Sequence, residues 1–305
     1  MRKLMTFLSV FLLGLNIHSQ DTSESQQPLP IIDMHMHTGL PHEMPVGTPS
    51  ICRPAPCSGD SKSVNSSDLK EKTFEAIKRY NIVKAFLSGV DLLAVQEWSQ
   101  TTPDLFIASP FILEPTNSNL EKLKKLYSDG TLKGMGEIGV QLNGIPPNDP
   151  SLEPYFELAE ELDLPVLIHL GIGPYTPNFK SAAGSPLLLE EVLIKHPELR
   201  IFVENAGFPK GDEMITMMYQ YPQLYADLST ITWVIPRTAF YDYLEKLIDA
   251  GLGKRLMFGS DQMVWPEKIG EAVKAIEEAP FLTFEEKRDI FYNNAARFLR
   301  LEEVN

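Results

Sequence analysis

The chain is poor in cysteine and in basic residues. Only two cysteines occur among 305 residues, too few for the four-ligand cysteine sites of structural zinc modules. Lysine and arginine number 27 against 41 acidic residues, giving a formal net charge of −14. Nucleic-acid binding needs basic patches, so this balance argues against a nucleic-acid partner. No Gly-x-Gly-x-x-Gly turn follows the first predicted strand, which argues against a dinucleotide-binding sheet.

Long apolar runs are also lacking, except at the start of the chain. Arg2 and Lys3 precede a mostly apolar stretch, 4–17, in the pattern of a secretory signal that is too short to span a bilayer comfortably. We expect residues 1–20 to be removed on export to the periplasm or the exterior, with no stable membrane insertion afterwards. An uncleaved membrane anchor is the alternative. The polar residues 21–28 predict a disordered lead-in to the folded domain.

The two cysteines stand close together in a Cys-Arg-Pro-Ala-Pro-Cys segment. In an exported protein Cys52 and Cys57 predict a disulfide, and a ring of this size contributes roughly 2 kcal/mol in the loop-entropy model. A metal-binding thiol pair is the alternative. The pair lies in a long Pro-, Gly- and Ser-rich loop, 38–67, that begins where the first predicted strand ends. We expect this loop to wall a site, with His42 and Arg53 as candidate substrate contacts.

Short apolar strands alternate with amphipathic helices along the rest of the chain. The predicted strands are 29–37, 82–87, 105–108, 132–140, 165–169, 199–205, 224–228 and 255–261. The predicted helices are 68–80, 91–100, 120–127, 151–162, 187–195, 213–221, 240–248 and 283–298. Such alternation predicts a parallel sheet, and eight units favour a single-domain (β/α)8 barrel, a TIM barrel, over residues 29–303. An open doubly wound sheet is the alternative.

Four of these strands end in residues able to bind a metal ion. His35 and His37 are two apart on the first strand and therefore share one face. Glu137, His169 and Asp261 stand at or near the ends of the fourth, fifth and eighth strands. In a (β/α)8 barrel these ends meet at one face, where active sites lie. Imidazoles with carboxylates suit zinc and similar cations, so we expect a metal centre there.

At this point the chain resembles a known family. The motifs Ile-Asp-Met-His-Met-His, Gly-Glu-Ile-Gly, Pro-Val-Leu-Ile-His, Tyr-Ala-Asp-Leu-Ser, Phe-Gly-Ser-Asp and Asn-Asn-Ala-Ala-Arg-Phe-Leu are similar to those of the amidohydrolase superfamily, in its amidohydrolase-related (amidohydrolase 2) branch. The resemblance covers residues 31–301. It implies that His35 and His37 form the first-strand metal pair and that Glu137 bridges two metals in binuclear members. It also implies that His169 is a ligand, and that Asp261 both binds metal and takes a proton from the attacking water.

One position departs from the family pattern. The family commonly has His on strand six, where this chain has Asn205. Asn is a poor zinc ligand and cannot act as a base, so we expect one bound cation and a catalytic role for Asn205 in holding the substrate carbonyl. Two cations would require a replacement ligand, with Glu204 or His42 as candidates. Strand alternation predicts that Glu204 faces away from the site, in a structural salt bridge.

These residues fit a metal-dependent hydrolase of amides, esters or lactones. Alternatives are a metal-dependent decarboxylase of the same branch, then a TatD-type nuclease, and a degenerate member that binds without turnover. The expected partner is a small molecule, cyclic or carboxylate-bearing, contacted by Tyr175, Lys180, Trp233 and Arg237 in the loops after the fifth and seventh strands. The sequence leaves the oligomeric state open, including a homo-oligomer.

Overall fold

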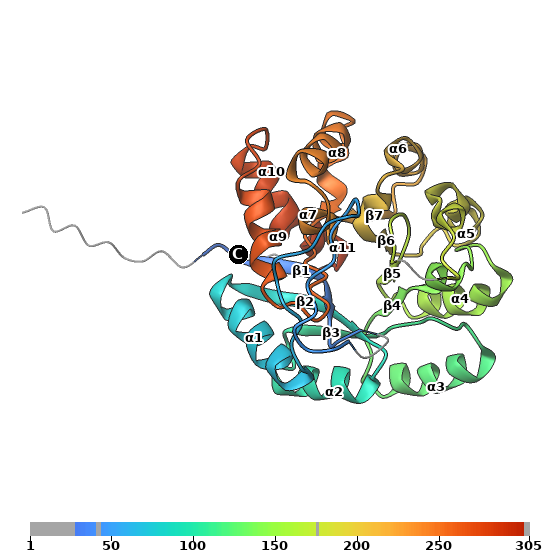
Figure 1. Ribbon diagram of the computed structural model, residues 1–305. Helices are drawn as coiled ribbons and strands as arrows, with labels where there is room; N and C mark the ends of the chain where they lie inside the picture. Colours follow the sequence, from blue (N-terminus) through green and yellow to red (C-terminus); the bar gives the residue numbers. More distant parts are fainter. Residues whose placement is uncertain (1–27, 41–43, 175–176, 302–305) are drawn as a thin grey trace, which may run out of the picture.

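The computed structural model describes residues 28–40, 44–174 and 177–301, and within them eight parallel strands surround a common axis (Figure 1). Hydrogen bonds join them in two runs, β1-β2-β3 and β4-β5-β6-β7-β8. The strands are β1 (Ile31–His37), β2 (Ile82–Gly89), β3 (Phe106–Pro110), β4 (Met135–Ile138), β5 (Val166–Ile168), β6 (Ile201–Val203), β7 (Leu224–Asp227) and β8 (Leu256–Met257).

Hydrogen bonds between backbone groups also cross both seams between the two runs. At one seam Ile112 N donates to Glu137 O at 2.7 Å, just beyond β3 and within β4. At the other, Met34 N in β1 donates to Phe258 O, directly after β8, at 2.8 Å. The sheet therefore closes on itself, and the predicted (β/α)8 barrel is confirmed. In the alternative, an open sheet, β1 and β8 would not be joined.

The helices form a ring outside the strands (Figure 1). They are α1 (Ser66–Arg79), α2 (Leu92–Thr101), α3 (Asn117–Ser128), α4 (Glu153–Glu161), α5 (Glu190–Lys195), α6 (Gly211–Gln220), α7 (Ile231–Val234), α8 (Arg237–Asp249), α9 (Lys268–Glu277), α10 (Phe284–Arg288) and α11 (Asn294–Phe298). No helix in the described part of the chain is long and apolar enough to cross a membrane.

Several helical regions differ from the sequence expectation, among them the short helix α7, which was not predicted. Helix α9 was not predicted, although its buried residues Ile269, Val273 and Ile276 follow helical spacing. The predicted helix 283–298 is interrupted, because a π-helical turn, Asp289–Asn293, separates α10 from α11. Its predicted capping box is present at the start of α10.

The barrel interior is filled by side chains. Ile32, Met34, Phe86, Leu167, Phe202 and Met257 pack there as one cluster, joined by Phe298 of α11. The ring centroids of Phe86 and Phe202 are 5.5 Å apart, and those of Phe202 and Phe298 are 5.3 Å apart, both edge to face. This packed layer blocks one end of the barrel and leaves the carboxyl ends of the strands for the site.

An irregularity in β1 separates that packed layer from the histidine pair. The register of β1 against β2 shifts between Asp33 and Met36. Met34, within the shift, belongs to the interior cluster, whereas Met36, at its end, belongs to the outer core under the helices. The shift lets β1 supply an apolar residue to the interior plug and both imidazoles to the space above it.

Strands near the site also end earlier than predicted. β6 stops at Val203 because Asn205 and Ala206 adopt left-handed backbone angles, with φ of 55° and 46°. β8 stops at Met257, and Asp261 beyond it is left-handed as well, with φ of 43°. Left-handed residues break the two-residue alternation of a strand. Side chains beyond these points therefore take directions that strand periodicity does not predict.

Candidate metal centre

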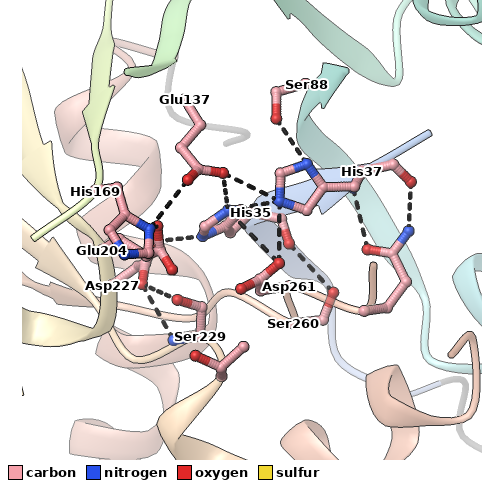
Figure 2. A network of polar contacts seen from close by, with 12 residues as sticks. His35, His37, Ser88, Glu137, His169, Glu204, Asp227, Ser229, Ser260 and Asp261 are labelled. Carbon is pink, nitrogen blue, oxygen red and sulfur yellow. Dashed lines mark hydrogen bonds and ion pairs between the residues drawn. The ribbon is translucent and has the colours of Figure 1, made fainter. Parts of the chain in front are cut away.

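His35 and His37 project side by side from the end of β1 (Figure 2), with Nε2 atoms 3.0 Å apart. Nδ1 of His35 donates to Asp227 Oδ2 at 3.1 Å, which leaves the Nε2 lone pair of His35 directed into the site. Nδ1 of His37 lies 2.9 Å from the hydroxyl of Ser88. Both rings are buried and oriented from behind, as metal-binding imidazoles are.

Two carboxylates complete this group of donors. Glu137 Oε2 lies 3.4 Å from Nε2 of His35 and 3.2 Å from Nε2 of His37. Asp261 Oδ1 lies 3.0 Å from Nε2 of His37 and 3.8 Å from Nε2 of His35. Strands β1 and β4 and the turn after β8 thus bring four donor atoms together, as the strand-end pattern led us to expect.

The spacing and the unsatisfied atoms of this group fit a bound cation. Ligands about 2.1 Å from one metal ion, at tetrahedral or right angles, lie about 3.0–3.4 Å from each other. Asp261 Oδ1 is buried, and its close polar contacts are the Nε2 atoms of His37 and His35. A buried carboxylate oxygen that faces only imidazole nitrogens needs a proton or a cation between the atoms, and a cation at the centre of the four donors would meet that need.

A second group of donors lies on the other side of Glu137. Glu137 Oε1 is 3.1 Å from Nδ1 of His169, and Glu204 Oε2 is 2.5 Å from the same nitrogen. Nε2 of His169 donates to the carbonyl of Ile172 at 3.1 Å, so its Nδ1 presents a lone pair to two carboxylate oxygens. Such a contact is repulsive unless a proton or a cation lies between the atoms. Glu137 therefore faces one donor group with each of its oxygens.

Glu204 faces the site, contrary to the prediction from the sequence. Phe202, two residues earlier, packs inside the barrel, so strand alternation turns Glu204 inward toward His169, and the left-handed turn at Asn205 places Asn205 beside it. The Asn205 amide donates to Glu204 Oε1 at 2.6 Å. Its oxygen accepts from Thr230 Oγ1 at 2.5 Å and from Ile231 N at 3.2 Å. The contacts of Asn205 thus hold Glu204 in place against the segment after β7.

The charges of the centre are unbalanced in favour of carboxylates. Burial alone would raise the pKa of Glu137, but hydrogen bonds from His169, His35 and His37 hold that pKa well below its ordinary value. Burial raises the pKa of Glu204 to about 8, although the neighbouring His169 opposes the shift. Burial would lower the pKa of His37, yet Asp261 and Glu137 raise it to about 9. Protons thus occupy positions that a cation would take.

Some supporting residues escaped the sequence analysis. Asp227, which orients His35, accepts at Oδ1 from Asn205 N at 2.9 Å and so connects the two donor groups. Gln262 accepts from His37 N at 3.1 Å and donates to His37 O at 2.7 Å. The Tyr-Ala-Asp-Leu-Ser motif contained the signal for Asp227, whereas nothing in the sequence singled out Gln262.

All the donors except the fully buried His35 line a cavity of about 330 Å³. Among the predicted substrate contacts, Lys180, Trp233 and Arg237 do not line it. Trp233 is buried and donates from Nε1 to Ser260 O, while Arg237 donates to Thr232 O beside the Tyr241 ring. Tyr175 and His42 lie outside the described residues. Arg53 does line the cavity.

A family model matches nearly the same residues as those that form the barrel. The amidohydrolase family model matches residues 32–301. The chain belongs to the amidohydrolase family. Amidohydrolase-superfamily enzymes are metal-dependent, and the two groups of donors are candidate ligands for such a metal. No curated protein sequence matches this amidohydrolase.

Solved structures share the fold at low sequence identity. An uncharacterised TIM-barrel protein from Bordetella bronchiseptica has a TM-score of 0.65 and 16% identity, covering 89% of this chain and 99% of that one. A probable 2-pyrone-4,6-dicarboxylic acid hydrolase from Acinetobacter baumannii has a TM-score of 0.60 and 16% sequence identity, and the match covers 88% of this chain and 99% of that one. A 5-carboxyvanillate decarboxylase from Novosphingobium aromaticivorans, complexed with manganese, has a TM-score of 0.56 and 15% sequence identity. The match covers 77% of this chain and 81% of that one. Hydrolases and decarboxylases thus share this amidohydrolase barrel.

Proposed function

We propose that this chain is a metal-dependent hydrolase that uses water to attack the carbonyl carbon of an amide, ester or lactone. The observation that carries the proposal is the convergence of four donor atoms from His35, His37, Glu137 and Asp261, three of which line a cavity: His37, Glu137 and Asp261. Asp261 Oδ1 is buried, and its close polar contacts are imidazole nitrogens of this group. Buried polar donors beside a cavity are suited to binding a cation and a reacting group, whereas apolar side chains would fill the same space at a lower desolvation cost.

A divalent cation held by these donors would supply Lewis acidity, which makes water nucleophilic near neutral pH and polarises the substrate carbonyl. Asp261 is the proposed base, because its carboxylate borders both the donor group and the cavity. It accepts a proton from water and returns it to the leaving group. Asp227 keeps the His35 ring in the tautomer whose Nε2 faces the site.

We propose zinc at the position bounded by the two imidazoles of β1, because imidazoles with carboxylates suit that ion. A second cation position is bounded by Glu137, His169 and Glu204. Glu204 replaces the imidazole that Asn205 cannot supply, and Asn205 acts as a positioning residue through its hydrogen bond to Glu204. The sequence favoured one cation, whereas the contacts of Glu204 support two.

Hydrolysis is tested on purified protein loaded separately with zinc and with manganese. A panel of lactones, esters and amides is assayed for acid release, and metal-free protein is the control. We expect turnover of at least one class that depends on added metal. Tight metal binding with no turnover across the panel would contradict the proposal and favour a member that binds without catalysis.

Decarboxylation is the second candidate, supported by the shared fold of the 5-carboxyvanillate decarboxylase. The same protein preparations are therefore assayed for carbon dioxide release from aromatic carboxylic acids. Release of carbon dioxide without ester, lactone or amide hydrolysis would replace the first proposal with this one. Asn205 stands where the family resemblance implies a histidine, and Asn cannot act as a base, which is why we rank hydrolysis first.

We also propose that the protein is exported. Support comes from the basic start and apolar run of residues 1–17, and from the disulfide that joins Cys52 and Cys57. Disulfides persist in oxidising compartments. Intact-mass measurement of protein from its native host should show loss of about the first 20 residues. Full-length protein recovered from the cytoplasm would contradict export.

A further inference from the structure

The lining of the cavity changes from polar to apolar away from the metal donors. Most of the lining outside the donor groups is apolar, and it comes from the segments that follow β1, β3, β5 and β7. It includes Leu40, Met44, Ile51, Phe111, Ile172 and Val234. A reacting carbonyl must lie at the donors, so the remainder of a bound substrate faces this apolar part. A charged group placed against it would lose its hydration, which is costly.

Arg53 has a structural part in the cavity wall. It is the one lysine or arginine among the described residues that line the cavity. Its backbone N donates to Val234 O at 2.6 Å, and its Nη2 donates to Gly173 O at 2.8 Å. These contacts fasten the loop after β1 to the segments after β5 and β7. A carboxylate beside this guanidinium would therefore compete with a contact that holds the wall together.

Phe111 is the apolar lining residue that contacts a metal donor directly. It follows β3, and its ring packs edge to face on the ring of His37, with centroids 5.7 Å apart. A Cβ at Gly139 would lie 2.9 Å from Phe111 Cζ and 3.4 Å from Glu137 Oε1. Glycine at that position therefore leaves room for the ring beside the carboxylate that faces both donor groups. The ring thus lies next to the place where a substrate carbonyl would bind.

We propose that the substrate is an uncharged ester, amide or lactone whose acyl chain is apolar, and that Phe111 selects against branching next to the carbonyl. This inference rests on the proposed hydrolase function and names its substrate class. The apolar lining favours the chain, because burial of each methylene tightens binding roughly three- to fourfold. The Phe111 ring narrows the cavity at the donors, because a quaternary carbon beside the carbonyl would need the space that the ring occupies. The carboxylate-bearing substrate that the sequence also allowed should bind poorly.

Alkyl hydroxamic acids test the substrate class without turnover, because the hydroxamate group binds metal and carries an acyl chain. Calorimetry on the metal-loaded protein compares aceto-, butano- and hexanohydroxamic acid. Each added methylene should tighten binding roughly three- to fourfold. Adipic monohydroxamic acid, in which a carboxylate replaces the terminal methyl of the hexano compound, should bind at least about tenfold more weakly than that compound. Equal affinities along the series, or a carboxylate compound that binds as tightly as its apolar counterpart, would overturn the inference.

Two isomeric hydroxamic acids isolate the part played by Phe111. Pentanohydroxamic and pivalohydroxamic acid have the same composition and differ in branching beside the carbonyl. The wild-type protein should prefer the unbranched isomer at least about tenfold. Phe111→Ala should remove most of that preference, because it opens space at the donors, and Phe111→Leu should keep part of it. No preference in the wild type, or an unchanged preference in Phe111→Ala, would overturn the assignment.

Phe281→Ala is the matched control. Phe281 is also partly buried and also packs edge to face on another ring, that of Tyr241, with centroids 5.5 Å apart. It does not line the cavity. Its removal should leave the preference between the isomers unchanged, whereas an equal loss of preference in both variants would show a general loosening of the fold and overturn the role of Phe111.

Turnover separates this inference from the proposed function. The ratio of kcat/KM for 4-nitrophenyl pentanoate to that for 4-nitrophenyl pivalate is measured on the same variants. Because the two esters differ in intrinsic reactivity, the change of this ratio from wild type to Phe111→Ala is the quantity compared, and it should fall as the hydroxamate preference does. Hydrolysis with no dependence on chain length or branching would overturn the inference and leave the hydrolase function standing. The expected hydroxamate preferences with no hydrolysis of any ester would instead count against the hydrolase function.

Discussion

The end of β1 and the turn after β6 bring donors to the same centre by different backbone routes. At β1 an extended backbone sends His35 and His37, two residues apart, to one side. After β6 a left-handed turn lets the adjacent residues Glu204 and Asn205 serve together, one as a donor and one as its support. Strand alternation turns the donors inward in both places, and after β6 the left-handed turn adds the support of Asn205.

The two routes also yield donor groups of different chemistry. The β1 side offers two imidazoles with two carboxylates, whereas the β6 side offers one imidazole with two carboxylates, and Glu137 belongs to both. Glu204 also lies within reach of His35 and Asp261. Imidazole-rich sites suit zinc, and carboxylate-rich sites also suit harder ions such as manganese. The two positions should therefore differ in metal preference, and the following variants test that difference in order of expected effect.

The largest effects are expected at the β1 position. His37→Ala deletes a strong ligand, so metal content at this position and turnover should both be lost. Asp261→Asn keeps an oxygen for the metal but removes the base, so metal should stay while kcat falls by at least roughly 100-fold. Elemental analysis and kinetics on the same preparations give the comparison. Near wild-type turnover by metal-bound Asp261→Asn would show that the assigned proton acceptor is wrong.

Glu204→Gln should affect the second position most, with a smaller effect at the β1 position, because Glu204 also lies within reach of His35 and Asp261. The substitution keeps the size of the side chain but removes the charge that faces His169. Bound metal should fall from two equivalents to one, with the loss greater for manganese than for zinc. His37→Ala is the matched variant on the other side, where the loss should be greater for zinc. Identical losses of both metals in the two variants would remove the distinction between the positions.

A substitution at Gly136 should displace the neighbouring residue Glu137, which faces both donor groups, by shifting the backbone. The φ of Gly136 is +98°, and a Cβ there would lie 2.2 Å from Leu167 O. Gly130 has a similar φ of +75° with nothing within 4 Å, so Gly130→Ala controls for the left-handed conformation, about 1–2 kcal/mol. Gly136→Ala should lower the free energy of unfolding by roughly twice as much or more. It should also weaken both metal positions, as titration with a chelator will measure.

The smallest effect is expected for Asn205→Gly. Glycine keeps the left-handed backbone of the turn but removes the amide that donates to Glu204. Affinity at the second position should fall by roughly three- to tenfold, about the worth of one hydrogen bond. Metal at the β1 position should not change. A loss as large as that of Glu204→Gln would mean that Asn205 does more than support its neighbour.

Sequence patterns predicted the barrel because each strand, and most helices, show a hydrophobic periodicity of their own and are bounded by residues typical of element ends. They also brought His35, His37, Glu137, His169 and Asp261 to one face, since those residues stand at strand ends that the topology gathers. Glu204 was misplaced because the alternation was counted from Asn205, which lies in a left-handed turn, whereas the inward-facing residue of β6 is Phe202. Three loop residues that were predicted to contact substrate do not line the cavity: Lys180, Trp233 and Arg237. Loop residues have no repeating side-chain direction, and their direction is set by contacts such as that of Trp233 with Ser260.

The centre also straddles the two seams of the barrel. His35 and His37 belong to the three-stranded run, whereas Glu137, His169, Glu204 and Asp261 belong to the five-stranded run or follow it. A cation bound between them would fasten the two runs together, so its binding free energy would add to the free energy of folding. The midpoint of thermal unfolding should therefore rise with free metal concentration. Newly made chains would complete the barrel most readily in a compartment that supplies the ion.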